Sequence, residues 1–262
     1  MLRREAHPRT ARSVSMVIRS FSGCDFRIVP GNKVRMLIIR GLLGSALQLG
    51  VFAALLLIPA GTWRWPRGIQ FLSAYAIVLI VATVWLAKAA PSSLEARLDP
   101  AISAKQPVAD RFATAFIGVA VAAWMVLIPI DVFRWHLLPA PSLGVSVFGA
   151  VLGAAGFAIL LTALYQNAFA TPVVRDQSER GHILVDIGLY GRVRHPFYTG
   201  FLIFLLGLAL WLESYAAVLA LPVVLASLVV RMSVEEETLC ETLPGYRQYM
   251  ERVRYRLIPR VW

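Results

Sequence analysis

Charged residues are scarce in this sequence. Of its 262 residues, 16% are Asp, Glu, Lys or Arg, whereas about 25% is usual in soluble domains. Hydrophobic residues make up 58% of the chain, and the mean hydropathy is +0.66. The composition therefore excludes an ordinary soluble globular protein.

Acidic residues are scarcer than basic ones. The 26 Lys and Arg residues against 15 Asp and Glu leave a net charge of +11. In a soluble chain this excess would suggest a nucleic-acid partner, so the positions of the basic residues have to decide its meaning.

Cysteine is almost absent. Cys24 and Cys240 lie far apart, and both fall in segments that the topology described below assigns to the cytosol. A disulfide framework is therefore excluded, and a zinc cluster with it, so we expect no metal site.

Long apolar runs are abundant. A helix needs roughly 20 predominantly apolar residues to cross a bilayer. Four uncharged runs have about this length, and two shorter runs follow, separated by the single charge of Glu213. The six runs are 41–60, 68–87, 112–130, 143–165, 196–212 and 214–230. They predict an all-α polytopic membrane bundle of about six transmembrane helices with a C-terminal helical hairpin, 196–230; a re-entrant or interfacial hairpin is the alternative.

The basic residues predict the orientation of these spans. Twenty-three of the 26 Lys and Arg residues fall in alternate segments. The positive-inside rule then assigns both termini and the loops 88–111 and 166–195 to the cytosol. The positive charge is thus a topology signal that also favours anionic lipid headgroups, and we expect the lipid bilayer rather than nucleic acid as a partner.

The chain divides into three regions. Residues 1–40 are basic and lack the apolar core of a secretory signal, which predicts a disordered cytosolic tail. A transit peptide, or a later start at Met16 or Met36, is the alternative. Residues 41–165 form the four-span region, and residues 166–262 form the candidate catalytic region.

Small residues recur on one face of the fourth span. Gly149 and Gly153 are four residues apart, and Gly156 follows three residues later. This spacing predicts that another helix approaches the fourth span closely.

Polar residues concentrate in two segments that flank the hairpin, 167–198 and 231–260. Because the hairpin goes out and returns, we expect both segments to meet on the cytosolic side and to form one site. Ionisable residues at such a boundary are costly unless they have partners or a function.

The first segment ends with Arg194, His195 and Pro196, where the chain enters the membrane. Proline is favoured at the first position of a helix, so these residues predict a helix N-terminus. Its free N–H groups and dipole favour an anionic group, while Tyr198 and Gly200 allow an aromatic contact and a close approach. Simple interfacial anchoring is the alternative.

The second segment begins with Arg231 and Glu235, an i, i+4 pair at the membrane exit of the last span, and Glu236 follows. An unpaired charge is expensive at this boundary, which favours a functional role over a solvated acidic turn. Further on, Tyr246 and Tyr249 either cover the site or pack at the interface.

Together these residues resemble the isoprenylcysteine carboxyl methyltransferase family, which includes related membrane phospholipid methyltransferases. The resemblance covers roughly the C-terminal 100 residues and rests on an RHP-x-Y-x-G turn followed by an exiting R-x-x-x-E-E helix. The matching residues are Asn167, Gln177, His182, Gly188 to Arg192, Val193 to Gly200, Arg231, Glu235, Glu236, Leu239, Gly245, Tyr246, Tyr249 and Arg254 to Pro259. The loop 61–68 also looks like that of bacterial members, so a multi-pass protein of the bacterial inner membrane is expected.

The resemblance implies a methyltransferase that uses S-adenosyl-L-methionine, held at the cytosolic ends of the helices. It assigns Arg231 and Glu235 to the reacting groups, with the roles of Glu235 and Glu236 interchangeable. It assigns acceptor contacts to Asn167, Tyr246 and Tyr249, and cofactor contacts to His182, Tyr190, Arg194, His195, Pro196, Tyr198 and Glu236. The sequence has no strand followed by G-x-G-x-x-G, which excludes a soluble Rossmann-type methyltransferase.

The chemistry of carboxyl methylation fits a site at the membrane edge. A cationic sulfonium and an anionic nucleophile neutralise each other on the way to the transition state, so a dry site favours the reaction without a general base. We expect an amphiphilic or prenylated acceptor whose apolar tail enters from the lipid. The runner-up is N-methylation of a phospholipid amine, and a non-enzymatic transporter or scaffold is the alternative outside the enzymes. The sequence does not indicate the oligomeric state.

Overall fold

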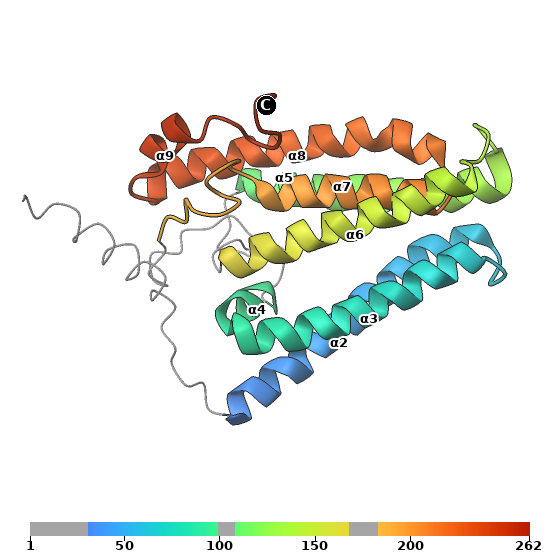
Figure 1. The fold of residues 1–262 in the computed structure, drawn as a ribbon, viewed down its shortest axis with the longest axis horizontal. Coiled ribbons are helices and arrows are strands. Elements are labelled where there is room, and N and C mark those ends of the chain that lie inside the picture. The colour runs from blue at the N-terminus through green and yellow to red at the C-terminus, as the bar shows by residue number, and fades with distance from the viewer. Residues whose placement is uncertain (1–30, 99–107, 168–182) are drawn as a thin grey trace, which may run out of the picture.

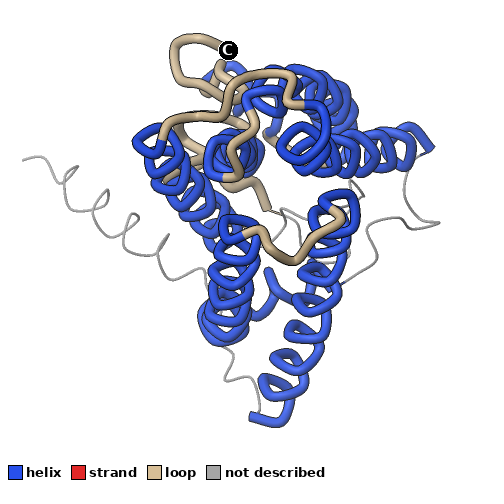
Figure 2. Tube along the Cα trace, turned by 90° about the vertical axis from the view of Figure 1, so that its right-hand side faces the viewer, coloured by secondary structure: helices blue, strands red, loops and turns tan. Residues whose placement is uncertain are grey.

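The long helices of this protein run side by side in a bundle (Figure 1). The computed structural model describes residues 31–98, 108–167 and 183–262, and these ranges contain helices, turns and loops but no strand (Figure 2). The helices are α2 (Gly31–Ala60), α3 (Pro66–Ala89), α4 (Pro91–Leu98), α5 (Val108–Ile130), the π-helical turn η1 (Asp131–Trp135), α6 (Leu143–Gln166), α7 (Pro196–Trp211), α8 (Tyr215–Thr242) and α9 (Tyr246–Arg252).

The predicted all-α polytopic membrane bundle is confirmed. Among the described residues, five helices are long and apolar enough to cross a bilayer. They are Asn32–Ala60, Pro66–Ala89, Val108–Trp135, Leu143–Gln166 and Tyr215–Thr242. The sixth apolar helix, α7, is shorter, with 16 residues.

One predicted boundary is wrong. Helix α2 begins at Gly31, so residues 31–40 are helical and do not belong to a disordered tail. Leu37 is buried there in a cluster with Leu86 of α3 and Leu94 of α4, and this apolar contact supports the additional helical turns. The rest of the predicted tail, residues 1–30, lies outside the described residues.

Helices α7 and α8 form the predicted hairpin, and its turn reaches the end of the bundle opposite α9. At this turn Glu213 pairs with Arg67 at 3.2 Å, and the Trp211 indole donates to the carbonyl oxygen of Arg67 at 3.2 Å. Ser214 donates to the carboxylate of Asp131 at 2.7 Å. Since Arg67 lies in the first turn of α3 and Asp131 follows α5, the hairpin extends along the whole bundle.

The glycine face of α6 packs against α7, as the sequence predicts. A Cβ atom added to Gly149 would lie 2.5 Å from the Cβ of Leu210 and 2.9 Å from the carbonyl oxygen of Gly207. A Cβ atom added to Gly200 would lie 2.8 Å from the carbonyl oxygen of Gly156. Glycine is therefore needed at these crossings, where two helix backbones touch.

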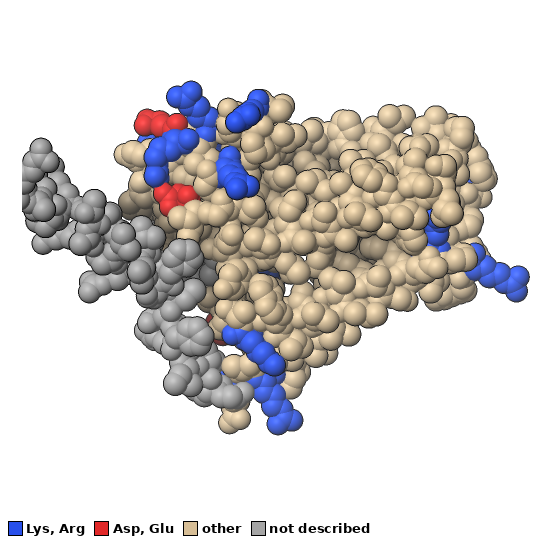
Figure 3. All heavy atoms as spheres, in the orientation of Figure 1, with Lys and Arg blue, Asp and Glu red and all other residues tan. Residues whose placement is uncertain are grey.

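Charged side chains gather mainly at the end of the bundle that carries α9, hereafter the α9 end. Figure 3 shows acidic and basic side chains over α8 and α9, further basic side chains at the lower left, where α2 and α3 lie, a smaller basic group at the opposite end, and an apolar stretch between. Helix α8 contributes because it continues past its apolar run, through Arg231 and Glu236, to Thr242. Arg231, Glu235 and Glu236 therefore stand on a continuous helix rather than in a loop.

Candidate functional site

The turn before α7 is held by the C-terminal segment of the chain. The backbone N–H of Arg194 donates to the carbonyl oxygen of Tyr255, and that of His195 donates to the carbonyl oxygen of Arg256, both at 2.9 Å. The Arg194 side chain also donates to two carbonyl oxygens of this segment, each at 2.9 Å. Residues 253–257 thus lie alongside the RHP turn and fix its backbone.

The predicted helix start at Pro196 is confirmed. Helix α7 begins there with Pro196 in its first turn, and its N-cap, His195, makes no side-chain capping hydrogen bond. The first N–H groups of a helix have no partner within the helix, and the helix dipole is positive at this end. This end of α7 therefore suits an anionic group.

Glu236 is the centre of the first polar cluster, in which one carboxylate accepts bonds from three side chains. Its Oε1 accepts from Nε of Arg194 at 2.7 Å and bonds Nε2 of His195 at 3.0 Å. Its Oε2 accepts from Nη2 of Arg256 at 2.7 Å and from Nε at 3.1 Å. Glu236 and His195 are buried. Two guanidinium groups face a single carboxylate, so this Glu236 cluster retains a positive charge that suits an anionic ligand group.

Arg231 is the centre of the second polar cluster, which lies on three helices. Its Nε donates to the hydroxyl of Tyr198 at 3.0 Å, and that hydroxyl donates to Glu235 Oε2 at 2.9 Å. On the other side, Nη1 pairs with Asp110 Oδ1 at 3.1 Å and donates to Thr114 Oγ1. Arg231 and Asp110 are buried. This Arg231 cluster holds one cation and two carboxylates, of which Asp110 pairs with Arg231 and Glu235 is reached through Tyr198, so its charge balance is opposite to that of the Glu236 cluster.

Tyr190 lies in a buried layer beside these clusters. Its hydroxyl is 3.5 Å from the carbonyl oxygen of Ala163, and its own carbonyl oxygen accepts from the Tyr249 hydroxyl at 2.7 Å. Burial raises the pKa of Tyr190, while a side-chain hydrogen bond from Asn167 lowers it. Asn167 and Tyr190, two predicted site residues from the first polar segment, are thus in contact.

The predicted acceptor residues Tyr246 and Tyr249 are both buried. Their ring centres are 5.5 Å apart, and they pack in a cluster with Leu243 and Val253. Burial also raises the pKa of each phenol. This geometry fits the packing alternative, and contact with an acceptor stays a prediction for both residues.

The structure brings together most of the predicted site residues at the α9 end. His182 lies outside the described residues. The residues in or directly beside the two polar clusters are Tyr190, Arg194, His195, Pro196, Tyr198, Arg231, Glu235 and Glu236.

Sequence reasoning missed four polar residues at this site. Arg256 falls within the segment that carries the resemblance, so its charge could have indicated that it belongs to the site. Asp110 and Thr114 belong to a distant helix, and their spacing in the sequence does not relate them to Arg231. Arg97 of α4 places its guanidinium carbon 5.6 Å from the Phe197 ring centre, and burial lowers its pKa to about 10.

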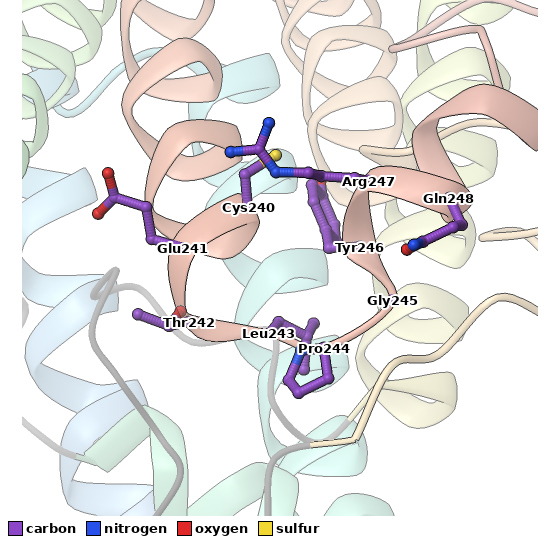
Figure 4. A pocket seen from close by; sticks show the side chains of 9 residues that line it. All are labelled: Cys240, Glu241, Thr242, Leu243, Pro244, Gly245, Tyr246, Arg247 and Gln248. Atoms are coloured by element: carbon purple, nitrogen blue, oxygen red, sulfur yellow. The ribbon is translucent and has the colours of Figure 1, made fainter.

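A hollow of about 240 Å³ lies in the turn between α8 and α9, lined by residues 240–248 (Figure 4). Of the predicted site residues, Tyr246 lines it, and neither Glu235 nor Glu236 does. Gly245 forms the turn with a φ of 84°, which favours glycine. The hollow therefore lies beside the two polar clusters rather than inside them.

Comparison with known proteins confirms the family resemblance over the C-terminal half. The family model described as phospholipid methyltransferase matches residues 145–244. The protein-S-isoprenylcysteine O-methyltransferase of Schizosaccharomyces pombe (strain 972) is 32% identical over 83 residues, which is 31% of this chain and 35% of the yeast protein. The chain thus spans about a third of the length of this curated relative. The family match includes Arg194, Arg231 and Glu236, whereas Asp110 and Arg256 lie outside it.

Proposed function

We propose that this protein is a membrane methyltransferase that uses S-adenosyl-L-methionine and methylates an amphiphilic acceptor at the cytosolic face, with carboxyl O-methylation of a prenylated acceptor as the reaction. The observation that carries the proposal is the meeting of the RHP turn with Arg231, Glu235 and Glu236 of α8 at one end of the bundle. The match to the phospholipid methyltransferase family supports it, since residues 145–244 include both the RHP turn and these three residues of α8.

The residues at this end fit the charges of the cofactor. When bound, S-adenosyl-L-methionine supplies a methyl group on a sulfonium cation, and its amino-acid part carries a carboxylate. Arg194 and Arg256 of the Glu236 cluster, with the N-terminus of α7, suit that carboxylate. The surplus carboxylate of the Arg231 cluster, Glu235 on Tyr198, suits the cation. The proposed contacts of Tyr190, Pro196 and His182 complete this cofactor site.

Arg231 and Glu235 act nearest the acceptor in this proposal. Tyr198, Thr114 and Asp110 fix the guanidinium plane of Arg231, which orients it for an acceptor carboxylate. The burial of Arg231 keeps water away, and a low dielectric favours a reaction in which opposite charges disappear. Orientation of the acceptor then supplies much of the rate.

The bilayer delivers the acceptor. Its apolar tail enters between helices from the lipid, and its polar end meets the α9 end, where Asn167, Tyr246 and Tyr249 are the proposed contacts. The distribution of basic residues assigns this end, with both termini, to the cytosol, and the inner membrane of a bacterium is the proposed location.

A labelling experiment tests the proposal. Membranes containing the protein are incubated with S-adenosyl-L-methionine labelled in its methyl group, together with N-acetyl-S-farnesylcysteine or phosphatidylethanolamine vesicles. The expected result is transfer of the labelled methyl group to the farnesylcysteine. Mild alkali should then release this label as methanol, because methyl esters hydrolyse and N-methyl groups do not. No transfer above that of membranes lacking the protein, with either acceptor, would overturn the proposal.

N-methylation of a lipid amine is the second candidate. Pairing of Arg231 with Asp110 leaves Glu235 as the surplus charge of the Arg231 cluster, and a carboxylate favours an amine over an acid. The amine would have to lose its proton before it attacks. Alkali-stable label in phosphatidylethanolamine would select this reaction.

A further inference from the structure

Asp110 is a completely buried carboxylate that contacts the candidate site from outside the segment that resembles methyltransferases. It has 0% exposure and lies in the first turn of α5. Its Oδ1 is 3.1 Å from Nη1 of Arg231, and no predicted role accounts for it. Burial of a charge is costly unless it is paired, so a carboxylate in this position indicates a structural or functional role.

The contact is built by the packing of two helices. Thr114 follows Asp110 by one helical turn, so both side chains lie on the same face of α5. That face meets α8, where Trp124 of α5 also donates to the carbonyl oxygen of Ala217 at 2.7 Å. Asp110 and Thr114 both contact Nη1 of Arg231. Helix α5 therefore holds one side of the guanidinium group.

The opposite side of the guanidinium is held by the hydroxyl of Tyr198, which accepts from Nε at 3.0 Å. Contacts on both sides leave the guanidinium plane little freedom to rotate. The charge of Arg231 is balanced by Asp110, and Glu235 is the further carboxylate of the cluster, reached through Tyr198.

We propose that Asp110 is a positioning residue of the methyltransferase site: with Thr114 it fixes the guanidinium plane of Arg231 and offsets its charge. The inference rests on the proposed function and extends it to a helix outside the family match. Asp110 acts through Arg231 and does not touch the acceptor. Its loss should therefore lower kcat, and it should not raise KM for an anionic acceptor, since Arg231 then attracts that acceptor with an unbalanced charge.

The kinetic test compares Asp110→Asn with a matched control. Asp131→Asn removes another buried carboxylate, which lies at the opposite end of the bundle and accepts from Ser214 and from the backbone of Leu137. Asp110→Asn should lower kcat at least tenfold with KM unchanged or lower, and it should leave the affinity for S-adenosylhomocysteine within threefold. Asp131→Asn should leave kcat per folded molecule unchanged. An equal fall of kcat in both variants, or a rise of KM in Asp110→Asn, would overturn the positioning role.

A second measurement does not depend on turnover. In protein labelled with ¹⁵N-arginine, Arg231→Lys identifies the Nε–Hε signal of Arg231, which should exchange slowly with water. Asp110→Asn and Thr114→Val should shift this signal and speed its exchange, whereas Asp131→Asn should not. An unchanged signal in Asp110→Asn would overturn the positioning role even in an active enzyme. If the unmodified protein transferred no label to either acceptor, the proposed function would be overturned. A shifted Arg231 signal in Asp110→Asn would still show that Asp110 positions the Arg231 guanidinium group.

Discussion

Glu235 and Glu236 are adjacent on α8, but their carboxylates belong to different polar clusters. Glu235 accepts from the Tyr198 hydroxyl at 2.9 Å, whereas Glu236 accepts from Arg194 and Arg256, both at 2.7 Å. Successive residues of an α-helix point about 100° apart, since a turn takes 3.6 residues. The two glutamates therefore meet different neighbours, and their substitution should have different effects.

Glu236→Gln should destabilise the protein and weaken cofactor binding. The neutral amide leaves two arginines of the cluster without their carboxylate, and breaking a buried pair in this way costs about 3 kcal/mol. Thermal unfolding in detergent and calorimetric titration with S-adenosylhomocysteine would measure both effects. Glu235→Gln is the matched variant, and it should change stability less and turnover more. Identical behaviour of the two variants would contradict the division into two clusters.

Arg256→Ala should weaken binding of S-adenosylhomocysteine by about tenfold, or ~1.4 kcal/mol. The reason is that Arg256 provides two of the bonds to Glu236 and part of the positive charge of the cluster. The control is Arg252→Ala, which removes an exposed pair with Asp186 of the kind that contributes little. Calorimetric titration of both variants with S-adenosylhomocysteine is the measurement. Equal affinities of Arg256→Ala and Arg252→Ala would show that Arg256 does not belong to the cofactor site.

Arg231→Lys should lower turnover at least about tenfold, roughly 1.4 kcal/mol of transition-state stabilisation. Lysine keeps the charge but cannot reproduce the planar contacts with Tyr198, Thr114 and Asp110. Affinity for S-adenosylhomocysteine should change less than turnover. Turnover close to that of the parent, measured on the acceptor identified by labelling, would return Arg231 to a simple membrane anchor.

Gly207→Ala should destabilise the bundle by about 1–3 kcal/mol, because the added methyl group would lie 2.6 Å from the carbonyl oxygen of Gly149. Gly50→Ala is the control, since no atom lies within 4 Å of its added methyl group and alanine favours the helix. Thermal unfolding of both variants is the measurement. A stable Gly207→Ala variant would contradict the close packing of α6 and α7.

Single cysteines should report opposite sides of the membrane when placed at Gly245 and at Thr62. The first lies at the α9 end, and the second lies in the turn between α2 and α3. In a background with Cys24→Ser and Cys240→Ser, an impermeant thiol reagent should label Gly245→Cys only in inside-out vesicles and Thr62→Cys only in right-side-out vesicles. Labelling of both from the same side would refute the proposed topology.

The sequence by itself determined the long apolar helices and the two segments that carry the site, but not the short helix α4, which lies within the predicted loop 88–111. Apolar run length predicts each span locally, and the two polar segments must meet because they flank a hairpin. The sequence also predicted the close helix approach at the glycines of α6 and the helix start at Pro196. Each of these predictions depends only on the residue's own size or backbone conformation. The start of α2 was missed because it depends on Leu37 packing against α3 and α4.

Only the tertiary structure decided which residues face one another within the site. Asp110 reaches Arg231 because α5 packs on α8, and Arg256 reaches Glu236 because the C-terminal segment lies along the RHP turn. Sequence spacing shows which residues share a face of one helix, but it does not specify which distant helix covers that face. Burial raises the energetic importance of these ion pairs, because a charge enclosed between helices is strongly destabilising unless an opposite charge lies beside it.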